Sequence, residues 1–292
     1  MKNKDAIVKN IQDKGYCLVE GFLDEEELSK VIKGADEYFP DVDGLNKDAI
    51  EKLQHAVPFP FSANTLNQIP FDKNILDIAE LVLNSSEIRL TSSFIQAKYG
   101  TRYAKSFDQP LHNDAWNASS LVWPNLAPQY QRLYGILYLT DVDDRSAPTG
   151  VVDKAQALQL SLLSNDNWAR YLEEDYPELY KKETLIQAAA GDLLLFTGDL
   201  IHRGTAFRKE DGRRVAVFFN FHTASATWTG MHLWAGYPGR EDWPSFAEFV
   251  ESLSVRQREV LGFPKQGSDY WTDETRKGLQ QLYPAIDVSV YK

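Results

Sequence analysis

Two histidines and one aspartate in this sequence have the residue types and the spacing of a metal site. His112 and Asp114 are separated by one residue, and His202 follows ninety residues after the first histidine. On an extended strand, residues two apart leave the same face, so His112 and Asp114 can reach one ion. Two imidazoles and one carboxylate are the parts of a facial triad, which holds one face of Fe(II) and leaves its other positions open.

The short His-x-Asp pattern also has ordinary explanations, because a surface turn or a satisfied polar pair contains the same residues. Ligand chemistry favours a metal such as Fe(II), since imidazole and carboxylate together suit a borderline-hard ion. Cys17 is the only cysteine of the chain, which excludes an all-thiolate zinc or iron–sulfur site. The sequence around His202 is therefore needed to distinguish a metal site from an ordinary turn or polar pair.

That sequence predicts two strands that would position the site. Residues 190–192 predict a tight turn, and residues 193–197 predict a buried strand that ends shortly before His202. Residues 210–212 predict a hairpin-type turn, followed by a strand over 213–221. This layout places an arginine eleven residues after His202, at the start of the expected hairpin partner.

These motifs resemble those of the phytanoyl-CoA dioxygenase-like family of Fe(II)/2-oxoglutarate-dependent oxygenases. The resemblance implies that His112, Asp114 and His202 bind iron, and that Arg213 binds the distal carboxylate of 2-oxoglutarate. A planar guanidinium can grip a carboxylate with two parallel hydrogen bonds. Arg214 is the alternative, because successive strand residues face opposite sides and only one of the two arginines can point inward.

Three further residues are candidate contacts for 2-oxoglutarate. Gln96 and Lys98 share one face of a predicted strand over 88–99 and reach the ligand if that face lines the site. If it does not, Lys98 is a solvated charge at the rim. The family often has Ser or Thr two residues after the distal histidine, whereas this chain has Gly204 there, followed by Thr205. Thr205 is therefore the third candidate.

The resemblance implies a double-stranded β-helix, that is, a mainly β fold with flanking helices and a jelly-roll, cupin-like core. We expect one domain over residues 1–292, with a helical part at 1–85, the jelly-roll core at 86–222 and an aromatic and helical extension at 223–292. The aromatic loop at 116–130 is expected to form a wall or lid of the pocket. Residues 154–182 are expected to form an inserted helical segment.

The implied activity is the oxidation of a C–H bond in a small organic molecule, for example one of secondary metabolism, with Fe(II), O2 and 2-oxoglutarate. Hydroxylation is the first expectation, and desaturation, cyclisation and epimerisation are the alternatives within the class. Chlorination is not expected, because related halogenases have a small residue in place of the carboxylate of Asp114. A cupin-like metal protein with non-oxidative chemistry, or a jelly-roll binding module with a coincidental triad, would belong to other classes.

Composition restricts the partners of the chain. The hydrophobic content of 43% is sufficient for a large core, and no apolar run approaches the ~20 residues of a membrane helix. The net charge of −11 argues against a nucleic-acid backbone as the main partner. Because the first residues lack a secretory apolar segment and there is one cysteine, we expect a cytoplasmic enzyme for a small-molecule substrate. Monomer and homodimer both remain open.

Overall fold

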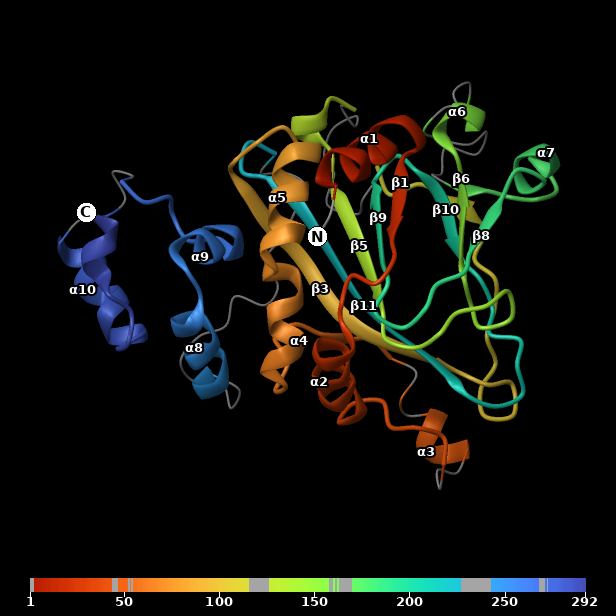
Figure 1. The fold of residues 1–292 in the computed structure, drawn as a ribbon, viewed down its shortest axis with the longest axis horizontal. Coiled ribbons are helices and arrows are strands. Elements are labelled where there is room, and N and C mark those ends of the chain that lie inside the picture. The colour runs from red at the N-terminus through yellow and green to blue at the C-terminus, as the bar shows by residue number, and fades with distance from the viewer. Residues whose placement is uncertain are drawn as a thin grey trace.

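The computed structural model of the chain describes residues 3–43, 47–51, 53, 55–115, 126–157, 160, 162, 170–226, 243–267, 271 and 273–292. Within these residues two antiparallel sheets lie side by side, and helices cover the larger sheet on its other face (Figure 1). This arrangement confirms the predicted fold, which is mainly β with flanking helices around a jelly-roll core. The organisation as one domain remains a prediction.

The larger sheet has six strands in the order β1-β9-β5-β11-β3-β2. Their bounds are β1 Tyr16–Val19, β2 Val57–Pro58, β3 Ile88–Tyr99, β5 Leu133–Tyr138, β9 Leu193–Thr197 and β11 Arg213–Thr223. Alternate residues of β11 face opposite sides: Val215 and Val217 belong to the core beneath the helices, whereas Ala216 and Phe218 face the smaller sheet. Both faces of this sheet are therefore buried.

The smaller sheet has five strands in the order β7-β4-β10-β6-β8. Their bounds are β4 Leu111–His112, β6 Thr149–Val152, β7 Arg170–Tyr171, β8 Thr184–Ile186 and β10 Ile201–Gly204. β10 pairs with β4 and β6, whereas β11 pairs with β3 and β5. The predicted hairpin between the strands of His202 and Arg213 is therefore wrong, because the chain crosses from one sheet to the other after β10.

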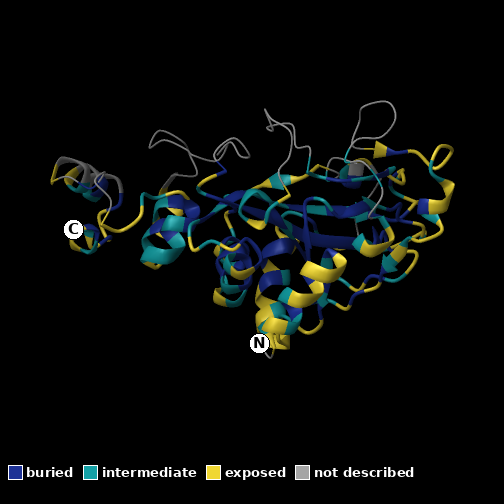
Figure 2. Ribbon diagram, turned by 90° about the horizontal axis from the view of Figure 1, so that it is seen from above, coloured by how far each residue is buried: buried dark blue, intermediate teal, exposed yellow. Residues whose placement is uncertain are grey.

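Helices from the N-terminal part contribute buried side chains to the core beneath the larger sheet, and several of them are exposed on the opposite side (Figure 2). Their bounds are α1 Lys4–Lys14, α2 Glu25–Asp36, α3 Lys47–Glu51, α4 Asn64–Gln68, η1 Ile69–Phe71 and α5 Lys73–Val82. α2 begins at a capping box, in which the side chain of Asp24 accepts from the backbone N–H of Glu27 and the side chain of Glu27 accepts in return. The part at 1–85 also contributes β1 and β2 to the larger sheet.

The C-terminal helices lie beyond α5, on the side away from the smaller sheet (Figure 1). Their bounds are α8 Trp243–Ser252, α9 Val255–Leu261, α10 Asp273–Leu282 and η4 Val288–Tyr291. The ring of Phe249 is 5.7 Å from that of Phe59, and Arg256 forms ion pairs with Asp77 and Glu80 of α5. No helix among the described residues is long and apolar enough to cross a membrane.

Three short helices occur in the connections, namely η2 Pro128–Tyr130, α6 Lys154–Ala157 and α7 Pro177–Tyr180. The expected helical segment at 154–182 is wrong in its described part, because only α6 and α7 are helical there. Between them Arg170 and Tyr171 pair as β7 with β4, so strand pairing outweighs local helix preference. Most of the expected lid at 116–130 and the aromatic loop at 227–242 lie outside the described residues.

Candidate metal and co-substrate site

The structure brings His112, Asp114 and His202 together at the smaller sheet. One ligand atom of each residue lies within 4.8 Å of the other two. His112 Nε2 is 3.9 Å from Asp114 Oδ1, and His202 Nε2 is 3.8 Å from Asp114 Oδ2. These distances are too long for hydrogen bonds, and they suit three donors that each approach one ion to about 2.0–2.2 Å. The donor set therefore fits a divalent metal.

Backbone carbonyl groups fix the tautomer of both histidines. His112 Nδ1 is 2.9 Å from Pro110 O, and His202 Nδ1 is 3.0 Å from Leu200 O. A carbonyl oxygen only accepts, so each Nδ1 carries the proton and each Nε2 keeps a lone pair for a metal. Burial, and then the neighbouring His202, lower the pKa of His112. This ring is therefore neutral near neutral pH, as a metal ligand must be.

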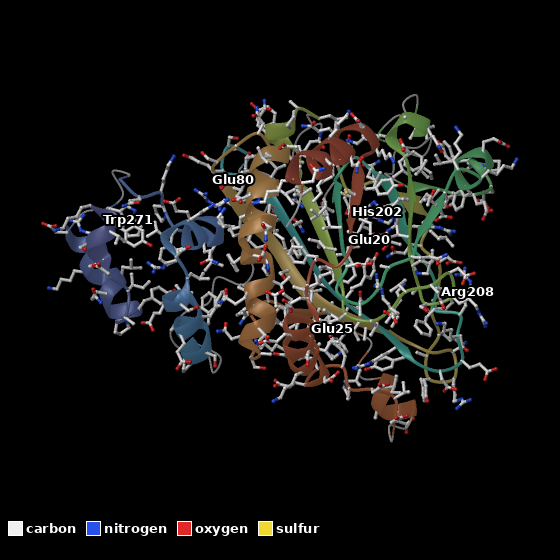
Figure 3. The ribbon with its side chains drawn as sticks, in the orientation of Figure 1. Glu20, Glu25, Glu80, His202, Arg208 and Trp271 are labelled. Atoms are coloured by element: carbon white, nitrogen blue, oxygen red, sulfur yellow. The ribbon has the colours of Figure 1, made fainter. Side chains whose placement is uncertain are left out.

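The pairing of two short strands sets the geometry of the triad. His202 of β10 pairs directly with His112 of β4, and their ring centroids are 4.5 Å apart. The backbone N–H of Asp114 donates to Gly198 O at 2.7 Å, which holds the carboxylate-bearing residue just beyond β4. His202 lies within the strand-rich half of the molecule, whereas Trp271 marks the C-terminal helices on the other side of α5 (Figure 3).

A glycine–aspartate turn fixes the start of β9, which leads into β10. Gly191 has a φ of 95°, in the left-handed region that favours glycine. The carboxylate of Asp192 accepts from the backbone N–H of Gly21 at 2.7 Å and of Ala189 at 2.8 Å. This turn ties the strand before His202 to the N-terminal part, and it is the reason for the Gly-Asp pair in the sequence.

A cluster of Tyr180, Glu183 and Arg203, here called the support cluster, holds the two ligand strands from outside. Arg203 follows His202 and therefore points away from the triad. Its guanidinium makes hydrogen bonds of 2.6 and 2.7 Å to Glu183 and lies 5.1 Å from the centre of the Tyr180 ring. The Tyr180 hydroxyl accepts from the backbone N–H of Leu111, the neighbour of His112, at 3.0 Å. The cluster thus connects β10 to β4.

The tight fit of this cluster depends on a glycine. A Cβ atom at Gly150 of β6 would lie 1.8 Å from Glu183 Oε1. Only glycine therefore leaves room for the carboxylate between β6 and Arg203. The pairing with Glu183 also raises the pKa of Arg203, so the guanidinium stays charged.

A cavity of about 240 Å³ adjoins the triad. Alternate residues of the two long strands line it, namely Phe94, Gln96 and Lys98 of β3 and Arg214, Phe218 and Asn220 of β11. The register places Arg214 beside Lys98, Phe218 beside Phe94, and Asn220 beside Ser92. Along the strands the wall of the cavity thus changes from a cationic end (Lys98 and Arg214) through an aromatic part to an amide end (Asn220).

The cationic end is built to receive an anion. Arg214 is only 4% exposed, its guanidinium lies 5.2 Å from the centre of the Tyr138 ring, and its Nε has no hydrogen-bond partner among the described residues. Burial lowers the pKa of Arg214, yet an arginine stays charged in proteins. Burial, and then Arg214, lower the pKa of Lys98 to about 8. Neither cation forms an ion pair within the described part of the chain, so a bound carboxylate would compensate their charge.

Arg213 lies outside the cavity. Its guanidinium forms a 2.6 Å ion pair with Asp36 of α2, on the face of β11 that packs against the helices. The expectation that Arg213 points into the site is therefore wrong, and the alternative, Arg214, points there. Spacing from His202 could not decide between them, because the intervening loop is not a tight hairpin and does not fix which residue of β11 faces inward.

Of the three other predicted contacts, two line the cavity and one does not. Gln96 and Lys98 line the cavity, as expected of one strand face. Thr205 does not line it, since its hydroxyl donates to Pro148 O at 2.7 Å and only its carbonyl accepts from Lys98 Nζ at 2.6 Å. Sequence reasoning missed Asn220, whose signal is a polar residue within an otherwise apolar strand.

Solved structures with the same fold include iron and 2-oxoglutarate enzymes. The epimerase SnoN, in complex with Fe3+, alpha-ketoglutarate and nogalamycin RO, superposes with a TM-score of 0.57 at 16% identity over 82% of this chain and 93% of SnoN. The carbocyclase SnoK gives 0.56 at 19% over 76% and 85%. EctD from S. alaskensis with bound Fe gives 0.55 at 17% over 76% and 77%. At these identities the similarity shows a shared fold.

Family membership follows from the sequence itself. No curated protein matches the chain in sequence. The family model of phytanoyl-CoA dioxygenase (PhyH), however, matches residues 11–215, well over half of the 292 residues and a range that includes the triad and Arg214. The match agrees with the clustered triad and confirms the resemblance seen in the motifs. The chain therefore belongs to the phytanoyl-CoA dioxygenase family of non-haem iron and 2-oxoglutarate-dependent enzymes.

Proposed function

We propose that this enzyme hydroxylates a C–H bond of a small organic molecule and that His112, Asp114 and His202 bind its iron. The observation that carries the proposal is the position of these three donors beside a cavity whose far end holds the buried Arg214 and the partly buried Lys98. When bound, Fe(II) with 2-oxoglutarate and O2 supplies the oxidising power. Substrate R–H, O2 and 2-oxoglutarate would give R–OH, succinate and CO2.

In this proposal Arg214 binds the distal carboxylate of 2-oxoglutarate. The Tyr138 and Phe218 rings lie 5.2 and 5.4 Å from its guanidinium and restrict its orientation, and the carboxylate would satisfy the unpartnered Nε. Lys98 adds a second positive charge at the same end, and Gln96 lines the cavity next to it.

The separation of Lys98 from the triad supports this assignment. Gly204 lies at the cationic end, because a Cβ atom there would be 3.6 Å from Lys98 Nζ. Gly204 is two residues from His202 on β10, which corresponds to about 6–7 Å along a strand. A five-carbon dicarboxylate spans this length from the triad to the two cations.

Hydroxylation is the outcome that we propose, because Asp114 provides a third protein ligand where a halogenase would leave room for chloride. The fold also carries other oxidations, since SnoN is named an epimerase and SnoK a carbocyclase. Product analysis by mass spectrometry separates these outcomes: a gain of one oxygen supports hydroxylation, whereas an unchanged mass or a loss of two hydrogens supports epimerisation, cyclisation or desaturation. A cytoplasmic location remains a prediction.

Anaerobic titration tests the proposed site. Fe(II) and then 2-oxoglutarate are added to the metal-free protein, and the visible charge-transfer band of the chelate is recorded. We expect the band in the wild type and in His55→Ala, an exposed histidine outside the cavity, and no band in His112→Ala. A well-folded, metal-loaded wild type without the band would contradict the proposal.

A further inference from the structure

We propose that Asn220 recognises the substrate of this enzyme, and that the substrate carries a neutral hydrogen-bond donor, a hydroxyl or N–H group, on an otherwise apolar body. The inference rests on the proposed function, because it treats the amide end of the cavity as the place of the substrate. It goes further by assigning a residue and a chemical class to that place.

The side chain of Asn220 is buried and only half satisfied. The residue is 7% exposed, its Nδ2 donates to Ser92 Oγ at 2.7 Å, and its Oδ1 is buried without a hydrogen-bond partner among the described residues. An unpaired buried acceptor destabilises a protein, because it has lost its hydrogen bonds to water without a replacement. An asparagine between Phe219 and Phe221 of an apolar strand is therefore costly for folding alone, and a ligand that donates to Oδ1 removes this cost.

The position of Asn220 relative to the triad fits a substrate contact. Asn220 pairs with Tyr134 of β5, and Tyr134 pairs with Phe196 of β9. The Tyr134 and Phe196 rings stack at 5.2 Å, and the Phe196 ring is 4.7 Å from that of His202. Asn220 thus lies in a row of side chains that reaches a metal ligand.

In the proposed site, 2-oxoglutarate lies toward the cationic end of the cavity, away from Asn220. Arg214 is six residues from Asn220 on β11, which corresponds to roughly 20 Å along the strand. A molecule held by the cationic end and a molecule held by the amide end can therefore approach the triad from opposite sides. This separation assigns the first position to 2-oxoglutarate and the second to the substrate.

The surrounding side chains set the chemical class. Among the described residues, the charged ones that line the cavity are Lys98, Asp114 and Arg214, and the proposed function already uses all three. The neighbouring wall is the stacked pair of Phe94 and Phe218, with centroids 4.7 Å apart and planes within 9°. A flat or apolar body packs on such a wall. Asn220 Oδ1 can accept a hydrogen bond from a neutral donor, so the donor needs no charge.

Matched pairs of aromatic alcohols and their methyl ethers test the proposal, because the ether keeps the shape and loses the donor. Binding to the protein loaded with Ni(II) and 2-oxoglutarate is measured by calorimetry. In the wild type we expect the alcohols to bind roughly tenfold more tightly than the ethers. Asn220→Leu should abolish the preference, and Asn220→Asp, which keeps an acceptor oxygen, should retain it.

Phe94→Leu is the matched control, since it changes the wall of the cavity without removing a polar group. We expect it to weaken the binding of alcohols and ethers equally and to leave the ratio of their affinities unchanged. The proposal would be overturned by equal binding within the pairs, by a preference that persists in Asn220→Leu, or by a library in which no pair binds. If Asn220→Leu does not fold, the wild type and Asn220→Asp still decide, because equal binding within the pairs in either protein overturns it.

The chelate band, recorded on the same preparations with Fe(II), keeps this result separate from the proposed function. A band in the wild type without any alcohol preference would contradict the role of Asn220 alone. An alcohol preference that depends on Asn220, in a protein that forms no band, would contradict the 2-oxoglutarate site and leave the recognition by Asn220 standing.

Discussion

The two sheets hold their parts of the site by different means. β3 and β11 of the larger sheet are paired at eleven positions, and this long register places Lys98 and Arg214 at the cationic end. The smaller sheet has strands of two to four residues, and His112 and His202 form the single pair between β4 and β10. Ladder hydrogen bonds thus position the anion site, whereas side chains such as the support cluster position the metal site.

This difference predicts where the site is sensitive to change. In the larger sheet the role of a residue depends on the face on which it lies, so neighbouring residues of one strand have different roles. In the smaller sheet the decisive quantity is the set of side-chain contacts around short strands, which have few ladder bonds of their own and open more easily. Substitutions can test each half separately.

The largest effect is expected from removing a metal ligand. His202→Ala should weaken Fe(II) binding more than about 100-fold, because replacing even the outer partners of metal ligands costs about 10- to 100-fold. Anaerobic calorimetry with Fe(II) measures the affinity, and His55→Ala serves as the exposed histidine control. Fe(II) affinity retained in His202→Ala would show that the metal does not bind at this triad.

The support cluster should have an intermediate effect on the metal. Tyr180→Phe removes the acceptor for the Leu111 N–H, and Glu183→Gln weakens the pair with Arg203. We expect each variant to lower Fe(II) affinity about tenfold. Tyr103→Phe is the control, since it loses a hydroxyl that donates to Asp211 on the surface. Loss of stability without loss of Fe(II) affinity would limit the cluster to a structural role.

Lys98 should make the affinity for 2-oxoglutarate depend on pH. Its pKa is lowered to about 8, so the amine is charged below that pH and loses its charge as the pH rises above it. The dissociation constant of 2-oxoglutarate should therefore increase about fivefold between pH 7 and 9. Lys98→Arg should remove this dependence, and Lys98→Met should show weak binding at both pH values. A wild-type affinity that matches Lys98→Arg across this range would exclude Lys98 as a contact.

The smallest effect is expected on the helix-facing side of β11. The side chain of Arg213 is 10% exposed and that of its partner, Asp36, is 46% exposed, and an ion pair whose carboxylate stays solvated contributes about 1 kcal/mol or less. Asp36→Asn should lower the free energy of unfolding in urea by no more than this amount. It should leave the affinity for 2-oxoglutarate unchanged. A marked loss of that affinity would indicate that Arg213 contributes to the 2-oxoglutarate site.

Local patterns predicted the elements that local physics determines. The strands predicted at 88–99 and 193–197 have the bounds of β3 and β9, because apolar and β-branched runs mark buried strands. The start of α2 is also a local feature, since the cap Asp24 and the first-turn carboxylates lie next to one another in sequence. The three metal ligands were also predicted as a set, and the structure brings them together.

Features that depend on tertiary pairing could not be predicted in this way. The choice between Arg213 and Arg214 depends on the register of β11 against β3, which a count from His202 across a long loop does not fix. Likewise, β7 forms only because β4 offers it an edge. The support cluster joins residues from β10 and the segment before β8, and no local sequence pattern links them.

Binding of 2-oxoglutarate to Arg214→Ala and Arg213→Ala is the most direct test of the proposed site. Each variant removes one arginine side chain, and the two side chains lie on opposite faces of β11. Removing one partner of a buried charge pair costs about 2–5 kcal/mol, so Arg214→Ala should weaken binding to the metal-loaded protein about 100-fold. Arg213→Ala should bind 2-oxoglutarate like the wild type. Equal affinities in the two variants, or a loss confined to Arg213→Ala, would contradict the proposed site.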